Sequence, residues 1–140
     1  MDSGYGAQYR ELYGNHWWWR AREHVLRDVL NSLALPASAE IVDFGCGDAL
    51  AFPLLQHYGR VRGIEVDSAL ISSDNPYRQD ISSAELGNPI YRDWKCDLLT
   101  ALDVIEHIED DRTAMAQLVD LLKPGGKMII TVPAFGSLWD

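Results

Sequence analysis

The sequence predicts an α/β fold in which short apolar strands alternate with helices around a mostly parallel sheet. Three observations lead to this prediction. The run Ile41-Val42-Asp43-Phe44 is apolar enough for a buried strand and leads into Gly45 and Gly47. Two more apolar runs, residues 61–67 and 96–103, have the length of strands. Helical patterns lie between these runs, and strands that alternate with helices pair in parallel through crossover connections.

Composition places the chain among ordinary globular domains and excludes several classes of function. Of its 140 residues, 47% are hydrophobic and 24% charged, which suits one domain with a real core. A net charge of -9 argues against a nucleic-acid partner, because phosphate contacts need a basic face. No apolar run approaches a membrane span, the N-terminus lacks a secretory signal, and Cys46 and Cys96 read as free thiols in a reducing compartment. We therefore expect a cytoplasmic protein that does not insert into membranes.

A helical leader of about residues 1–35 precedes a core of about residues 39–140 within this single domain. The leader contains His16-Trp17-Trp18-Trp19-Arg20-Ala21-Arg22, and Pro36 ends it. Three adjacent tryptophans cannot all face one core from a single helical turn, so one or two either cover a cleft or pack on the sheet. The helix continues with an apolar stripe at helical spacing: Val25, Leu26, Val29, Leu30 and Leu33.

The glycine turn after the first strand predicts a ligand site. Glycines at 45 and 47 allow backbone angles closed to other residues and let a ligand approach the main chain. Leu50 stands where a dinucleotide fingerprint needs its third glycine, which disfavours a nicotinamide oxidoreductase, and no phosphate-binding Gly-Lys-Ser or Gly-Lys-Thr is present. Asp43 and Asp48 would instead suit a cationic ligand. The alternative is an ordinary strand-turn-helix whose glycines only make the turn tight.

The remaining elements follow in order along the chain. A short helix should contain Phe52, Leu54, Leu55 and Tyr58, with Pro53 in its first turn. Strands are expected at residues 61–67, 76–81, 96–103 and 127–133. A helix over 110–122 should turn Met115, Leu118, Val119 and Leu122 inward, and Lys123-Pro124-Gly125-Gly126 should end it and turn the chain. Asp67 is expected to cap a helix over 68–73.

Acidic residues fall near the carboxyl ends of four expected strands: Asp43, Glu65, Asp80 and Asp103. Ligands of open parallel sheets bind in the crevice at those ends. Glu65 lies twenty residues after Gly45, near the spacing at which an acid accepts hydrogen bonds from ribose hydroxyls. These positions predict a ligand with a ribose and a cationic part.

Four motifs in this order resemble class I S-adenosylmethionine-dependent methyltransferases. They are Asp-Phe-Gly-Cys-Gly-Asp-Ala at 43–49, Gly-Ile-Glu at 63–65, Leu-Asp-Val-Ile-Glu-His-Ile at 102–108 and Leu-Leu-Lys-Pro-Gly-Gly at 121–126. Ala49 stands where this family usually has a third glycine. The leader is similar to that of small-molecule methyltransferases. The resemblance implies a Rossmann-like three-layer sandwich, S-adenosyl-L-methionine as cofactor, S-adenosyl-L-homocysteine as product, and a small-molecule acceptor.

The resemblance also implies roles for individual residues. Asp43 and the backbone of Gly45, Cys46 and Gly47 would hold the methionine part of the cofactor, and Glu65 the ribose. The adenine would lie against Val66, and Asp80 would accept from its amino group, unless Asp80 is a solvated turn residue. Asp103 would bind the cofactor and line the methyl-transfer face.

His107 is the candidate general base. An alternative is that Glu106 and His107 cap and pack the following helix. A third interpretation is a metal site, because Asp103, Glu106 and His107 resemble the metal-ligand cluster of some quinone-pathway O-methyltransferases. We nevertheless assign no metal ligand from the sequence.

The resembled class continues through two more strands, in the order 3-2-1-4-5-7-6, whereas this sequence supplies five. We expect a sheet truncated after the fifth strand, whose apolar edge would pair with a second copy to give a homodimer. The alternative function is a module that binds the cofactor without catalysis, in a regulatory role.

Overall fold

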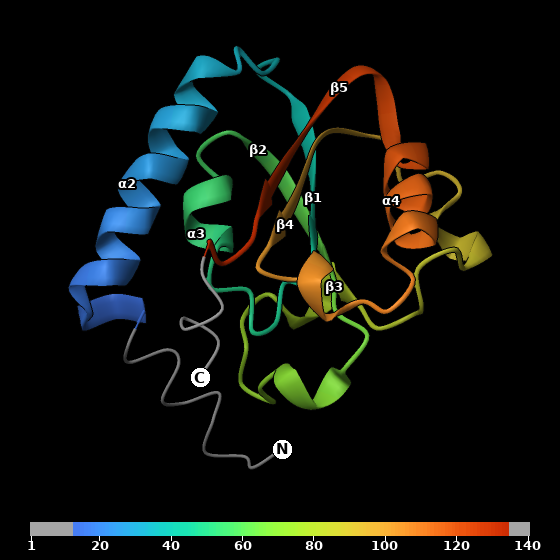
Figure 1. Ribbon diagram of the computed structural model, residues 1–140, viewed down its shortest axis with the longest axis horizontal. Coiled ribbons are helices and arrows are strands. Elements are labelled where there is room, and N and C mark those ends of the chain that lie inside the picture. The colour runs from blue at the N-terminus through green and yellow to red at the C-terminus, as the bar shows by residue number, and fades with distance from the viewer. Residues whose placement is uncertain (1–12, 135–140) are drawn as a thin grey trace.

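The computed structural model describes residues 13–134, which form a five-stranded parallel sheet with helices on both faces (Figure 1). The strands are β1 (Ala39–Phe44), β2 (Gly59–Ile64), β3 (Ile81–Ser82), β4 (Cys96–Leu102) and β5 (Leu122–Thr131). Their order in the sheet is β3-β2-β1-β4-β5. This confirms the expected order, and it places the reversal of strand order between β1 and β4, where open α/β sheets bind their ligands.

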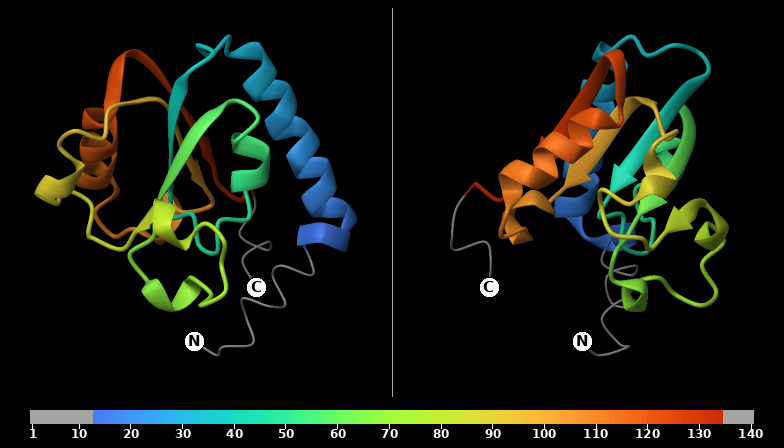
Figure 2. Two further views of the ribbon diagram at one scale, coloured as in Figure 1. Left: turned by 180° about the vertical axis from the view of Figure 1, so that it is seen from behind. Right: turned by 90° about the vertical axis from the view of Figure 1, so that its right-hand side faces the viewer.

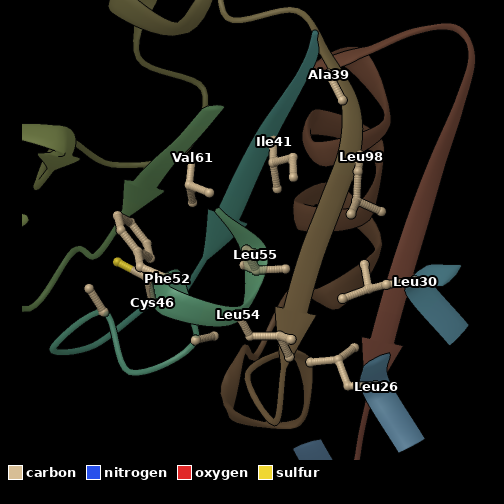
Figure 3. Close-up of a cluster of buried hydrophobic side chains, with 12 residues drawn as sticks. Leu26, Leu30, Ala39, Ile41, Cys46, Phe52, Leu54, Leu55, Val61 and Leu98 are labelled. Carbon is tan, nitrogen blue, oxygen red and sulfur yellow. The ribbon is translucent and has the colours of Figure 1, made fainter. Parts of the chain in front are cut away.

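Helices α2 (Trp17–Ser32) and α3 (Phe52–Leu55) cover one face of the sheet, and α4 (Asp111–Asp120) covers the other (Figures 1 and 2). Side chains of α2 and α3 pack on inward-facing residues of the strands (Figure 3), and the cluster includes Leu26, Leu30, Leu54, Leu55, Ile41 and Leu98. A second cluster lies under α4, with Leu118 packed against Val42, Phe44 and Leu99. Alternate residues of each strand serve the two faces, so the strands are apolar throughout.

The apolar stripes of α2 and α4 are narrower than the sequence predicts. Leu26 and Leu30 are buried and Leu33 is partly buried, but Val25 and Val29 are 64% and 39% exposed. In α4, Val119 is 53% exposed beside the buried Leu118. Successive helical residues are about 100° apart, so a residue next to the contact line points away from the sheet. Each helix therefore touches the sheet along little more than one line of side chains.

The expected third strand, residues 76–81, is wrong in extent. Residues Arg78–Asp80 form a 3-10 turn, and β3 is only Ile81–Ser82. Because Ile81 is paired with Gly63 of β2, Asp80 precedes the strand instead of ending it. The Asp67 cap is confirmed, because its Oδ1 accepts from the Ala69 N–H at 3.0 Å, but the helix it begins is a 3-10 turn over Ser68–Leu70.

The Lys-Pro-Gly-Gly segment does not form a separate turn after α4. Helix α4 ends at Asp120, and β5 begins at Leu122, which is paired with Cys96. The register then shifts, so that Leu98 is paired with Lys127. Gly125 has a φ of 78°, which glycine adopts without strain, and the segment is an irregular stretch within β5.

Within residues 13–134, β5 is an edge strand, and its outer side has no partner strand. Met128 and Ile129 are partly buried on opposite faces of the sheet, whereas Ile130 and Val132 are 39% and 54% exposed. None of the helices in the described part of the chain is long and apolar enough to cross a membrane.

Candidate active site

The predicted site residues meet where β1, β2 and β4 end, beside the reversal of strand order. Gly45 follows the last residue of β1, Glu65 follows β2, and Asp103 follows β4. Phe44 is paired with both Ile64 and Ala101, so these three strands end at nearly the same level. The expectation that acids from separate strands would share one edge of the sheet is therefore confirmed for Asp43, Glu65 and Asp103.

The two glycines of the turn have different reasons for being glycine. Both have positive φ, 67° at Gly45 and 52° at Gly47, which glycine adopts without a steric penalty. A Cβ at Gly45 would also lie 2.4 Å from Cγ2 of Val104, so the turn packs directly against the chain leaving β4. A Cβ at Gly47 would meet nothing within 4 Å. The main chain at Gly47 is thus open to the approach of a ligand.

The N–H groups of this turn already have acceptors within the protein. Gly45 and Cys46 both donate to the carbonyl oxygen of Ile64, at 2.8 and 3.3 Å. The Gly47 N–H donates to Oε2 of Glu65 at 2.9 Å. The backbone that the resemblance assigns to the methionine part therefore offers its shape and its carbonyl oxygens, with these three donors engaged elsewhere.

Cys46 is a packing residue of the turn. Its side chain is buried, and a Cβ added at Gly63 would lie 2.5 Å from its Sγ. Burial, with the nearby Asp43 and Glu65 carboxylates adding to it, raises the pKa of the thiol well above its ordinary value. The thiol is therefore protonated and unreactive, and any role in cofactor binding belongs to its backbone.

Ala49 adopts the left-handed backbone conformation that explains the usual glycine. Its φ is 59°, and the residue is 2% exposed. An L-residue in this region has its Cβ too close to the neighbouring carbonyl, which costs roughly 1–2 kcal/mol. The turn keeps its shape with alanine at position 49. Alanine in place of the usual glycine therefore adds backbone strain but does not disrupt the fold.

Two backbone hydrogen bonds fix the position of the Glu65 side chain directly after β2. The residue is 5% exposed, and its two carboxylate oxygens accept from two backbone donors, Gly47 N–H and Asp67 N–H, both at 2.9 Å. Each carboxylate oxygen can accept a second hydrogen bond. Val66, the next residue, is 49% exposed. Glu65 thus combines a fixed position with spare acceptor capacity, beside an open apolar side chain.

Asp43 is a buried carboxyl in the centre of the sheet. It is 3% exposed, and Oδ1 accepts from the Thr100 hydroxyl at 2.6 Å. Burial raises the pKa of Asp43 to about 7, with the negative charge of Glu65 adding to the rise, while the Thr100 hydrogen bond and the Arg22 charge oppose it. A cationic ligand nearby would favour the charged form of this carboxyl.

Asp48 does not share the role of Asp43. Its carboxylate accepts from the backbone N–H and the hydroxyl of Ser72, both at 2.8 Å, and from the Asn75 amide at 2.6 Å. It therefore ties the glycine turn to the segment after β2. The sequence predicts a cationic ligand from Asp43 and Asp48 together. In the structure Asp48 stabilises the turn instead, so only Asp43 is left for such a ligand.

Arg22 is the site residue that sequence reasoning missed. Its Nη1 lies 2.6 Å from Oδ2 of Asp103, and its Nη2 donates to Oγ1 of Thr131 at 2.8 Å. The Thr131 hydroxyl in turn donates to Oδ1 of Asp103 at 2.9 Å. One signal could have found Arg22: it lies one helical turn before Leu26 and two before Leu30, so it shares the stripe that faces the sheet.

The ring of Trp19 lies beside this arginine, and Tyr13 packs against that ring. The guanidinium carbon of Arg22 is 5.4 Å from the centre of the Trp19 ring, and Tyr13 lies 5.5 Å from Trp19. Trp17 and Trp18, by contrast, are 70% and 50% exposed. Of the three tryptophans, Trp19 is the one that joins the group above the strand ends.

His107 is exposed in a 3-10 turn over Ile105–His107, which follows β4. The cap of α4 is Asp110, which accepts from the Thr113 N–H at 3.1 Å, so the capping role considered for Glu106 and His107 is wrong. Both carboxylate oxygens of Glu106 are shielded from solvent without a hydrogen-bond partner among residues 13–134.

No cluster of three or more His, Cys, Asp or Glu side chains able to hold a metal occurs in this described range. Asp80 is exposed in the turn before β3, away from the carboxyl end of that strand.

The fold and this site define a class of protein, and comparison with known proteins identifies it. A family model described as a methyltransferase domain matches residues 18–139. The chain therefore belongs to this methyltransferase-domain family, and its Rossmann-like fold is shared by solved structures of S-adenosylmethionine-dependent methyltransferases.

Two curated relatives and one solved structure illustrate the similarity. An uncharacterized methyltransferase of Mycobacterium tuberculosis, Rv0089, is 30% identical over 131 residues, which are 86% of this chain and 63% of the relative. Trans-aconitate 2-methyltransferase of Azoarcus is 29% identical over 119 residues, covering 80% of this chain and 46% of that enzyme. The S-adenosylmethionine-bound structure of CalS10, an amino pentose methyltransferase from Micromonospora echinaspora, superposes with a TM-score of 0.67 at 20% identity and covers 98% of this chain and 59% of CalS10. The chain thus spans less than two thirds of the length of these relatives.

Proposed function

We propose that this chain transfers the methyl group of S-adenosylmethionine to a small-molecule acceptor, with the cofactor lying across the ends of β1, β2 and β4. The observation that carries the proposal is the pairing of two buried carboxyls, Asp43 and Glu65, with the open main chain at Gly47. Within residues 13–134 neither carboxyl forms an ion pair, and buried acids without a paired cation are costly, so these two suit a ligand with a sulfonium and an ammonium group. The charge of these residues therefore supports a cationic cofactor at this position.

Each strand end supplies one part of the proposed cofactor site. Glu65 accepts hydrogen bonds from the ribose hydroxyls, and the exposed Val66 packs against the adenine. Asp43 provides negative charge for the ammonium group. Arg22, whose positive charge acts on Asp43 and which already binds a carboxylate, provides the cation for the carboxylate of the methionine part. We leave Asp80 out of this site, because it lies in the turn before β3.

The cofactor supplies an electrophilic methyl group on a sulfonium, and the chain supplies orientation and a dry setting. Positive charge is lost as the methyl group moves, so alignment of donor and acceptor matters more than a strong base. Asp103 lines the transfer face. His107, exposed at the mouth after β4, is the group that takes a proton from an acceptor that must lose one.

The small-molecule acceptor is supported by charge and by relatives. A net charge of -9 disfavours a polyanion. The trans-aconitate and amino pentose methyltransferases act on small molecules, whereas one relative is named a tRNA methyltransferase.

An assay with methyl-labelled cofactor can offer a metabolite extract and a tRNA pool in parallel. We expect label in the small-molecule fraction. Label that appears in tRNA alone would contradict the proposal.

The second candidate is a module that binds the cofactor without turnover. It uses the same cofactor site as the first candidate and differs from it only in the absence of methyl transfer. Titration with S-adenosylhomocysteine, with NAD as control, should show binding of the first ligand only under either candidate. The label assay then separates them, because a non-catalytic module binds and gives no labelled product in any pool.

A further inference from the structure

We propose that Arg22 and Asp103 form a latch that holds α2 over the strand ends in the cofactor-free protein, and that Arg22 leaves Asp103 for the carboxylate of the bound cofactor. This inference rests on the proposed function, because it concerns the same site. In this latch, Asp103 competes with the cofactor for Arg22. Asp103 becomes available to the methyl acceptor only after the cofactor is bound.

The first observation is that the latch joins three elements through one side chain. Arg22 comes from α2, Asp103 from the end of β4 and Thr131 from the end of β5. The two terminal nitrogens of Arg22 bind one acceptor each, and the Thr131 hydroxyl closes the triangle to Asp103 at 2.9 Å. A ligand carboxylate that binds Nη1 and Nη2 together as a bidentate pair would compete with Asp103 and Thr131 for these two nitrogens.

The second observation is that the first half of α2 has few buried side chains. Leu26 and Leu30 anchor the second half in the core, whereas Trp17 and Trp18 are at least half exposed and Trp19 is only partly buried, beside Arg22. The side chains of Arg22 and Asp103 are 21% and 34% exposed, so their ion pair is only partly screened by water. The latch therefore governs the first turns of α2 and leaves the core contacts of the helix intact.

The third observation is the balance of charge at the strand ends. Three carboxyls, Asp43, Glu65 and Asp103, lie at these ends, and Arg22 is the cation that forms an ion pair with one of them. Asp103 also sits at a φ of 57°, a conformation that costs free energy unless the surroundings fix it. If Arg22 moved to a ligand, Asp103 would keep the hydrogen bond from Thr131 to its Oδ1. Its Oδ2 would then be available to the methyl acceptor.

The test is the affinity for S-adenosylhomocysteine, measured by calorimetry on wild type, Asp103→Asn and Thr131→Val. Asparagine tolerates positive φ, so Asp103→Asn keeps the backbone conformation. Removing a competitor for Arg22 should tighten binding about two- to fivefold, the range of a partly exposed ion pair. Thr131→Val, which removes the other acceptor of Arg22, should shift the affinity in the same direction.

Asp97→Asn is the matched control. Asp97 also forms an ion pair, with Lys123 at 2.8 Å, but at the opposite end of β4. It should leave the affinity unchanged. Binding that is equal or weaker in both Asp103→Asn and Thr131→Val overturns the latch, because a direct cofactor ligand loses affinity when it is neutralised. If wild type does not bind S-adenosylhomocysteine at all, the proposed function fails, and the latch with it.

Hydrogen exchange gives a second readout that needs no activity. In cofactor-free Asp103→Asn, the amides of residues 17–22 should exchange faster than in wild type, while those around Leu26 and Leu30 stay protected. Added S-adenosylhomocysteine should restore protection of residues 17–22, since Arg22 then holds the ligand. Unchanged exchange in the cofactor-free variant would show that the ion pair does not hold the helix.

Discussion

The Thr100 hydroxyl in β4 donates a 2.6 Å hydrogen bond to the Asp43 carboxyl in the adjacent strand β1, with both residues buried. Burial nevertheless dominates and raises the pKa of Asp43 to about 7, from 3.8. A carboxyl with a raised folded-state pKa binds more protons in the folded than in the unfolded protein between these two values. By linkage, folding stability must fall as the pH rises through that window.

We expect the free energy of unfolding to fall by a few kcal/mol, in order of magnitude, from about pH 4 to about pH 7, as far as Asp43 contributes. Urea unfolding of wild type and Asp43→Asn at several pH values measures this. The asparagine variant cannot ionise, so the difference between the two curves isolates Asp43. Equal slopes for both proteins across pH 4–7 would contradict the raised pKa.

The same carboxyl should make cofactor binding depend on pH. A cationic ligand favours ionised Asp43, so affinity for S-adenosylmethionine should rise up to about pH 7 and level off above it. In Asp43→Asn the affinity should be lower, and this part of its pH dependence should be absent.

Replacing Glu65 by glutamine should weaken binding of S-adenosylhomocysteine by on the order of 2–4 kcal/mol, because ribose hydroxyls lose a charged acceptor. Glutamine keeps the size of the side chain, but its NH2 group cannot accept, so it also loses one of the two backbone hydrogen bonds, from Gly47 or from Asp67. Asp67→Ala, which removes only the cap on Ala69, is the control and should bind nearly as wild type. Equal affinity in Glu65→Gln would show that the ribose lies elsewhere.

Ala49→Gly should stabilise the protein by about 0.5–1 kcal/mol. The φ of 59° strains alanine and not glycine, and the added flexibility of the unfolded chain offsets part of the gain. Thermal unfolding at fixed pH measures the shift. Ala34→Gly tests the same backbone effect at an exposed site with a φ of 49°, away from the crevice. A lower melting temperature in Ala49→Gly would mean that its methyl group contributes more by packing than it costs in strain.

His107→Ala should abolish turnover of an acceptor that must lose a proton while changing cofactor affinity by no more than a few-fold. The side chain is exposed, and Asp110 caps α4, so we expect the variant to fold. His57→Ala, an exposed histidine beside α3, is the control. Full activity in His107→Ala would remove it as the base. Activity that a chelator abolishes and a divalent ion restores would instead indicate a metal.

The 140-residue chain should associate with itself at high concentration through the outer edge of β5. Among residues 13–134 no strand pairs with the outer side of β5, and its backbone groups with the exposed Ile130 and Val132 favour pairing with another strand, although Pro133 limits its length. Light scattering after gel filtration should show a dimer that Ile130→Lys dissociates. Val25→Lys, at a more exposed apolar residue of α2, should leave it intact. A wild type that stays monomeric over the whole concentration range would refute the edge contact.

The predictable parts of the fold are those that residues close together in the sequence determine. The apolar runs that became β1 and β4 were predictable, as was the positive-φ turn at Gly45 and Gly47, because neighbouring residues alone decide them. The second strand was expected over residues 61–67 but spans Gly59–Ile64, so its presence was predictable and its bounds were not. The β3 boundary was not predictable either, since two paired residues leave no periodic pattern. Asp80 was consequently assigned to the wrong end of the strand.

The site was predictable where its residues follow strands and not where they come from elsewhere. Asp43, Glu65 and Asp103 stand at strand ends, which topology gathers. Arg22 and Thr131 are separated by 109 residues and meet only through the tertiary fold, so no spacing marks them. The engagement of Asp48 by Ser72 and Asn75 was hidden for the same reason, because the sequence does not tell which carboxylates already have partners.

The glycine turn is already complete before any ligand arrives. Its first three amide donors bind Ile64 and Glu65, and Val104 fills the space beside Gly45. A loop that is ordered in advance loses little conformational entropy on binding. The conformational cost of cofactor binding should therefore arise in α2 rather than in the glycine turn. We likewise expect the rates of cofactor binding and release to follow the motion of α2 rather than the folding of a loop.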